Sequence, residues 1–231
     1  MTKNYQRSLV RFSDILVRKT AILLNSPKKK YVEGEFLLLK PGVDEAEFWE
    51  YADEDTDCEL INGVLIIHSP ASEEHEDIFA QLIGIFRFYF GKTAKGKAYG
   101  SRFVMKLSKD WQPEPDILLL STGSLDRVMK THVEGPADVV VEILSRATRD
   151  LDLTQKLPKY LTAGVSEVWI VDPEKHEIEI HTPETKKGWK GSGEELVSST
   201  IFPDLKIKTK WIWDRDRYTI DKILTEIGRN L

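Results

Sequence analysis

The chain has 231 residues and a formal net charge of −5, and hydrophobic residues make up 41% of it. This length allows one substantial domain with additions or two small domains, and the acidic balance weighs against a protein whose main role is to coat nucleic acid. The single cysteine, Cys58, excludes an internal disulfide and a zinc site built on cysteines.

The sequence also bears on the compartment. No apolar run reaches the length of a membrane span, and the start "MTKNYQRSLVRF" lacks the apolar core of a secretory signal. A single cysteine suits a reducing environment. We therefore expect a cytoplasmic protein with no membrane partner.

The first half of the chain predicts alternating short elements. Residues 8–24 place apolar side chains at roughly helical spacing, so we expect a helix there, followed by a loop. The motifs "FLLLK" and "DEAEFWEYA" then predict a short strand and a short helix. "CELINGVLII" is two strand-like runs joined by Asn62-Gly63, which suits a type I′ hairpin turn. Ser72 is a candidate cap for a helix over 73–91, and "AYGSRFVMKL" follows as a strand or strand pair.

The second half predicts a buried sheet with helices. "DILLLS" and "DVVVEIL" are nearly continuous apolar runs, as in strands that are covered on both faces. "RDLDLTQKLPKYLTAG" has leucines four residues apart and a glycine cap at Gly164, and "EVWIVD" with "HEIEIHT" resembles a hairpin. "IFPDLKIKTKWIW" is a candidate edge strand, and residues 219–229 a terminal helix. The fold class is α/β (mixed α+β), with a mixed sheet flanked by helices.

Two carboxylates stand out in the apolar strands. Asp116 begins the first run and Glu142 lies inside the second, where an ionised carboxylate needs a cation, hydrogen bonds or a metal ion. If the strands are neighbours, the two side chains come close, and a cation between them would relieve their repulsion. Mg²⁺ fits that position, because it prefers oxygen ligands.

A lysine on the following helix completes this set. Lys156 lies four residues after Asp152 and beside the leucine stripe, so its amine can reach towards the two carboxylates. Pro158 should kink this helix or delay its start. A simpler alternative stays open for Glu142, a buried salt bridge to Lys156 or Arg149.

Two earlier residues are weaker candidates. Glu59 in the first strand of the Asn62-Gly63 hairpin is a third acid, although a cross-strand pair would also explain it. His75 begins the long helix and could contact phosphate or support a carboxylate. A surface or capping histidine is the alternative for that position.

The order of these motifs resembles a known family. "PEPDILLL", "VVVEILSRATRDLDLTQKLPKYLTAGVSEVWIVDP" and the upstream "CELINGVLIIHSPASEEH" are similar to the Uma-type family of restriction endonucleases, a branch of the PD-(D/E)XK nuclease superfamily. The resemblance implies a restriction-endonuclease-like fold, a central mixed sheet flanked by helices. It divides the chain into a helical or loop extension (1–43), a nuclease-like domain (44–205) and a strand and helix tail (206–231) packed on the same domain.

The resemblance also implies a metal site. Asp116 and Glu142 would be the acidic ligands, together with the backbone carbonyl of Ile143, and Glu59 would match an acid that many members supply from an early element. The expected cofactor is Mg²⁺ or Mn²⁺.

The usual lysine two residues after the second acid is absent, since position 144 is leucine. The resemblance implies that Lys156 takes its catalytic role from the next helix. His75, Arg149 and Lys159 are candidate phosphate or DNA contacts.

The resulting hypothesis is a metal-dependent endonuclease that hydrolyses phosphodiester bonds in DNA. A homodimer is expected, because enzymes that cut both strands often work as two-fold dimers. The alternative is a catalytically inactive module that uses the nuclease fold to bind nucleic acid or protein, which the acidic net charge favours. A hydrolase acting on RNA or a nucleotide is a third, weaker hypothesis.

Overall fold

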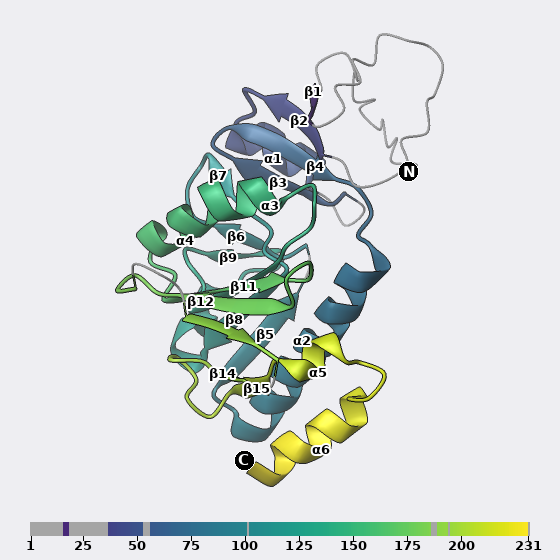
Figure 1. The fold of residues 1–231 in the computed structure, drawn as a ribbon. Coiled ribbons are helices and arrows are strands. Elements are labelled where there is room, and N and C mark those ends of the chain that lie inside the picture. Colours follow the sequence, from purple (N-terminus) through teal and green to yellow (C-terminus); the bar gives the residue numbers. More distant parts are fainter. Residues whose placement is uncertain are drawn as a thin grey trace, which may run out of the picture.

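The computed structural model describes residues 16–18, 37–52, 56–100, 102–185, 189–193 and 195–230. The described chain forms two larger sheets, two two-stranded sheets and helices that cover them (Figure 1). Every helix in these ranges is too short or too polar to cross a membrane.

The first larger sheet has five strands in the order β1-β2-β4-β3-β7, all antiparallel. The strands are β1 Leu16–Arg18, β2 Leu37–Pro41, β3 Cys58–Ile61, β4 Val64–His68 and β7 Trp111–Gln112. The predicted hairpin is β3–β4. Asn62 and Gly63 have φ of 52° and 72°, the left-handed pair that a type I′ turn requires.

The predicted helix over 8–24 is wrong where the structure describes it. Residues 16–18 form strand β1, which pairs with β2, and the rest of that helix lies outside the described residues. The apolar spacing there was too loose to distinguish a helix from an edge strand.

Two helices of the first half are confirmed. They are α1 Glu45–Tyr51 and α2 Glu73–Thr93. The side chain of Asp44 accepts a hydrogen bond from the backbone of Glu47, and Ser72 does the same for His75. These caps satisfy N–H groups that a helix start leaves unpaired. The α2 helix begins at the predicted residue 73, and α1 begins one residue into the predicted stretch.

The second larger sheet has six strands in the order β13-β12-β11-β10-β8-β5. The strands are β5 Gly96–Gly100, β8 Ile117–Ser121, β10 Val139–Ile143, β11 Glu167–Asp172, β12 Glu177–His181 and β13 Trp189–Ser192. β10 and β11 run parallel and the other neighbours antiparallel, so the sheet is mixed as predicted.

The helical segment around Pro158 is continuous but changes its winding. It consists of α3 Arg149–Leu151, a π-helical turn Asp152–Lys156 and α4 Leu157–Ala163, and it ends at Gly164 with φ of 101°. The backbone N–H of Leu157 donates to the carbonyl of Asp152, five residues back. A wider turn relieves the clash between a proline ring and the preceding turn. The expected kink is therefore replaced by a π turn that contains Lys156.

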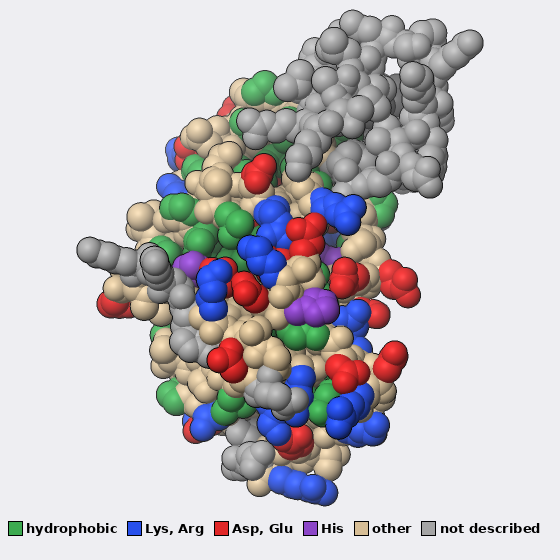
Figure 2. Space-filling model, viewed as in Figure 1, with side chains coloured by type: hydrophobic (Ala, Val, Ile, Leu, Met, Phe, Trp, Pro, Cys, Tyr) green, Lys and Arg blue, Asp and Glu red, His purple; other side chains and the backbone are tan. Residues whose placement is uncertain are grey.

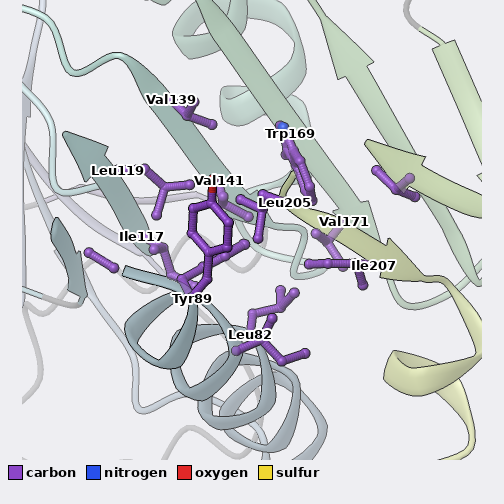
Figure 3. Close-up of a cluster of buried hydrophobic side chains, with 14 of the residues drawn as sticks. Leu82, Tyr89, Ile117, Leu119, Val139, Val141, Trp169, Val171, Leu205 and Ile207 are labelled. Carbon is purple, nitrogen blue, oxygen red and sulfur yellow. The ribbon is translucent and has the colours of Figure 1, made fainter. Parts of the chain in front are cut away.

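The six-stranded sheet is covered on both faces (Figure 1). On one face Leu82 and Tyr89 of α2 pack towards Val139 and Val141 of β10 (Figure 3). On the other face Val140 packs in a cluster that includes Tyr160 of α4. The alternation along β10 places Glu142 on the face of Val140, towards α4.

The C-terminal part differs in one respect from the sequence prediction. β14 Leu196–Ser198 and β15 Lys206–Lys208 pair only with each other, so the predicted edge strand does not extend the main sheet. Helices α5 Lys210–Trp213 and α6 Ile220–Asn230 follow, and α6 confirms the predicted terminal helix. The remaining elements are β6 Val104–Lys106, β9 His132–Glu134 and the 3₁₀ helix Thr122–Arg127.

Substitutions at two glycines test how closely β5 approaches β8. A Cβ at Gly96 would lie 2.1 Å from the carbonyl oxygen of Leu120 and 2.9 Å from Cε1 of Phe90, whereas a Cβ at Gly91 on α2 would meet nothing within 4 Å. We expect Gly96→Ala to lower the free energy of unfolding by about 2 kcal/mol or more. Gly91→Ala should raise it by about 0.5–1 kcal/mol, since alanine loses less entropy in a helix. Chemical denaturation measures both, and a neutral Gly96→Ala would contradict the close approach of the two strands.

Candidate active site

Asp116 and Glu142 meet where the start of β8 lies beside the end of β10. Val141 pairs with Ile117 in the antiparallel ladder, so the residues just beyond them also face each other. The backbone N–H of Ile143 donates to Oδ2 of Asp116 at 2.7 Å, and the N–H of Asp116 lies 3.4 Å from Oε2 of Glu142. The structure thus brings together the two acids that the sequence singled out.

The amine of Lys156 enters this site from the π turn. Its Nζ lies 2.8 Å from Oε1 of Glu142, 3.2 Å from Oδ1 of Asp152 and 3.3 Å from Oε2 of Glu59. The lysine side chain is only 4% exposed, so these carboxylates replace most of its water. Asp152, one turn before the lysine, is therefore part of this site.

Glu59 reaches the same amine from the other large sheet. Its side chain is fully buried, and its Oε1 lies 3.2 Å from Nε2 of His68. His68 was not predicted from the sequence, although the hairpin register contains the signal. Glu59 pairs with Ile66, and His68, two residues further on, lies on the same face of the sheet.

Two further side chains orient the acids. The hydroxyl of Tyr160 donates to Oε1 of Glu142 at 2.7 Å, and Nε2 of His75 lies 3.3 Å from Oδ1 of Asp116. Tyr160 was also not predicted from the sequence, although it follows Lys156 by four residues and therefore lies on the same side of the helix. His75 was predicted, and it contacts a carboxylate.

Burial and the neighbouring charges shift the pKa values of the carboxyl groups in this site in opposite directions. Burial disfavours the Glu59 carboxylate, but the adjacent Lys156 and His68 outweigh burial and lower its pKa to about 2. Burial is the dominant cause for Glu142 and raises its pKa, because Lys156 offsets only part of the effect and neighbouring acids add repulsion. Burial, with Asp57 and Glu59 nearby, also raises the pKa of Glu114 to about 8.

An acidic pocket of about 100 Å³ is lined by Lys156, by acids that include Glu114, Asp116 and Glu142, and by His75, Ser145 and Thr148. Within the described ranges, no three His, Cys, Asp or Glu side chains are already arranged as a metal-ligand set. The donors still fit a divalent ion that uses one or two carboxylates with water and phosphate. The buried Oε2 of Glu114 has no hydrogen-bond partner in the described part of the chain, which also indicates a site short of positive charge.

Two predicted phosphate contacts lie outside this pocket. Arg149 donates from both Nη atoms to the carboxylate of Asp172, at 2.7 Å each, which fastens α3 to the end of β11. The amine of Lys159 lies over the ring of Trp111, 5.2 Å from its centroid. The carbonyl of Ile143 was predicted as a ligand, and Ile143 does line the pocket. The catalytic and metal-binding roles of all these residues stay predictions.

Comparisons with known proteins agree with the fold and with the motifs. A family model described as "Uma2: Putative restriction endonuclease" matches residues 43–210. Among solved structures, the chain is similar to a protein from Anabaena variabilis ATCC 29413 that is described as "a putative nuclease belonging to DUF820". The two chains are 17% identical with a TM-score of 0.65, over 74% of this chain and 98% of that chain. This likeness confirms the predicted restriction-endonuclease-like fold. No curated protein matches the chain.

The Arg149–Asp172 pair gives a prediction for acid stability. The Arg149 guanidinium is the main cause that lowers the pKa of Asp172 from 3.8 to about 2. A carboxylate with a lowered pKa stabilises the fold above its unfolded pKa, and this contribution is lost as the pH falls through about 2. We expect a loss of about 2 kcal/mol between pH 4 and pH 2.

Denaturant unfolding followed by circular dichroism measures this loss. Asp172→Asn should be less stable at neutral pH and should lack this part of the acid-dependent loss. Asp126→Asn, at an exposed aspartate on the 3₁₀ helix, is the control and should keep the wild-type pH dependence. An unchanged dependence in Asp172→Asn would contradict the assignment.

Proposed function

Since the chain belongs to the Uma2 family, described as putative restriction endonucleases, we propose that it is a metal-dependent endonuclease that hydrolyses phosphodiester bonds in DNA. One observation carries the proposal. Asp116 and Glu142 meet at adjoining strand ends, and the amine of Lys156 lies 2.8 Å from Glu142 in the same pocket. Two hard oxygen donors and one ammonium are the groups that this chemistry needs.

The metal would be Mg²⁺ or Mn²⁺, held by Asp116, Glu142 and the backbone carbonyl of Ile143. When bound, such an ion polarises the phosphate and makes a water molecule a better nucleophile. His75 and the N–H of Ile143 hold the two oxygens of Asp116 in place. Tyr160 and Lys156 both contact Oε1 of Glu142, so its other oxygen, Oε2, is the one turned towards Asp116.

Lys156 would act on the substrate phosphate by its charge. An ammonium fixed beside the reacting group stabilises negative charge that develops in the transition state, and a buried setting strengthens the effect. Glu59, predicted as a third ligand, better fits a positioning role. It is fully buried and already contacts both Lys156 and His68, so it keeps the amine charged and oriented.

A catalytically inactive binding module is the second candidate. The burial of Lys156 favours it, because three carboxylates already surround the ammonium. Titration calorimetry with Mn²⁺ separates the two candidates. A chain that binds DNA but does not bind the metal would exclude the endonuclease and support the binding module.

A homodimer and a cytoplasmic location also belong to the proposal. Enzymes that cut both strands often work as two-fold dimers, and a single, buried cysteine suits a reducing compartment.

The activity is tested with supercoiled plasmid DNA. We expect relaxed circles in the presence of Mg²⁺ or Mn²⁺ and none in a chelator. Asp116→Asn and Glu142→Gln should slow nicking by about 100-fold or more, because each removes a charge from the reacting centre. Both amides keep the shape of the carboxylate and can still accept the bonds from Ile143 and Tyr160, so the fold should survive.

Asp126→Asn is the matched control, because it makes the same change beyond the opposite end of β8. It should nick at the wild-type rate. Full activity in either site variant would refute the assigned roles.

A further inference from the structure

A second, smaller pocket adjoins the acidic pocket. It has a volume of about 70 Å³ and shares Ser72, His75 and Ser145 with its neighbour. Its other walls come from Glu74 of α2, from the segment between β10 and α3, from Arg149 of α3 and from the turn after β11. Lys/Arg and Asp/Glu side chains lie intermixed on the surface near α3 and the β11–β12 turn (Figure 2).

Two arginines in this pocket converge on one carboxylate. Nη2 of Arg149 lies 3.0 Å from Oε2 of Glu174, and Nε of Arg146 lies 3.5 Å from its Oε1. Guanidinium groups bind carboxylate and phosphate in the same forked manner. The two guanidinium groups can therefore bind one anionic group, and the chain supplies one itself.

The two acids that contact Arg149 are held very differently. Asp172 is 3% exposed and makes two bonds to the guanidinium, so it fixes the arginine in place. Glu174 is 54% exposed and sits in the turn between two strands. Exposed ion pairs contribute little to stability, so Glu174 can leave the arginines with little loss to the fold while Arg149 stays oriented.

We propose that Arg146 and Arg149 form a subsite for a phosphate of the nucleic-acid strand, next to the phosphate in the acidic pocket. Glu174 occupies this subsite until the strand displaces it, and so acts as an internal competitor. The inference rests on the proposed function for the identity of the substrate. It adds where the neighbouring phosphate binds and which side chain opposes its binding.

Binding of a short fluorescein-labelled DNA duplex to the full chain tests the subsite, with Ca²⁺ in place of Mg²⁺ to limit cleavage. Fluorescence anisotropy over a series of salt concentrations gives the affinity and its salt dependence. Glu174→Gln should bind several-fold more tightly than the wild type, because the competitor is gone. Arg146→Gln should bind more weakly, and its log–log salt slope should be shallower by about 1, the value for one lost phosphate contact.

The double variant separates competition from a general charge effect. In the Arg146→Gln background, Glu174→Gln should give a much smaller gain, because one of the two arginines that Glu174 contacts is missing. Glu184→Gln makes the same change near the opposite end of β12 and should leave binding unchanged. Arg146 is 83% exposed, so its replacement should not affect folding.

The outcomes keep the subsite and the nuclease distinct. If Glu174→Gln binds no more tightly, or gains as much without Arg146, the subsite is refuted whether or not the plasmid is nicked. If the gain in affinity depends on Arg146 but no metal supports nicking, the subsite is supported and the endonuclease function is refuted. A wild-type chain that does not bind the duplex at all overturns both.

Discussion

A single buried ammonium joins the parts of this fold that make the site. Lys156 contacts Glu59 on one large sheet, Glu142 on the other and Asp152 on its own π turn. Taking charged groups out of water costs several kcal/mol for each ion, and only close partners offset this penalty. The hairpin, the end of β10 and the π turn must therefore keep their mutual positions, because a shift of any one leaves a buried charge without its counterion.

The same cluster holds more negative than positive charge. Lys156 and His68 are enough to keep Glu59 ionised, and its pKa falls to about 2. They are not enough for Glu142 and Glu114, whose pKa values rise because burial dominates. The cluster thus has two parts. In the inner part, around Glu59, the carboxylate is neutralised by its neighbours, whereas the part that faces the pocket has too little positive charge for its acids. A divalent cation is the natural complement of the second part, and the ammonium of Lys156 lies between the two parts, 2.8 Å from Glu142 and 3.3 Å from Glu59.

The sequence predicted those features that depend on local chemistry. The turn at Asn62-Gly63, the cap at Ser72 and the burial of 139–143 on both faces each follow from a few neighbouring residues, and each is confirmed. The approach of Asp116 to Glu142 was predictable because two buried apolar runs in sequence are often neighbours in a sheet.

The missed features depend on tertiary context. The π turn before Pro158 relieves the clash of the proline ring without a kink. The proline alone predicts that the helix must adjust, but not in which of these ways. Glu114 lies two residues before Asp116, but its burial follows from the meeting of the two sheets. Residues 206–208 do not join the main sheet but pair with residues 196–198, a partner that the sequence pattern does not indicate.

The helical origin of the lysine has a physical consequence. Position 144 lies on the same strand face as Glu142, where a lysine would project directly from the sheet, but Leu144 is 4% exposed and packs in the core under α4. The amine comes instead from a helix whose position relative to the sheet is set by Tyr160 at one end and the Arg149–Asp172 pair at the other. A strand-borne lysine would be fixed by the sheet ladder, whereas this one is fixed by side-chain contacts. The geometry of the acidic pocket is thereby coupled to the Arg149–Asp172 pair, which holds the helix that carries the amine whether or not Glu174 contacts the arginine.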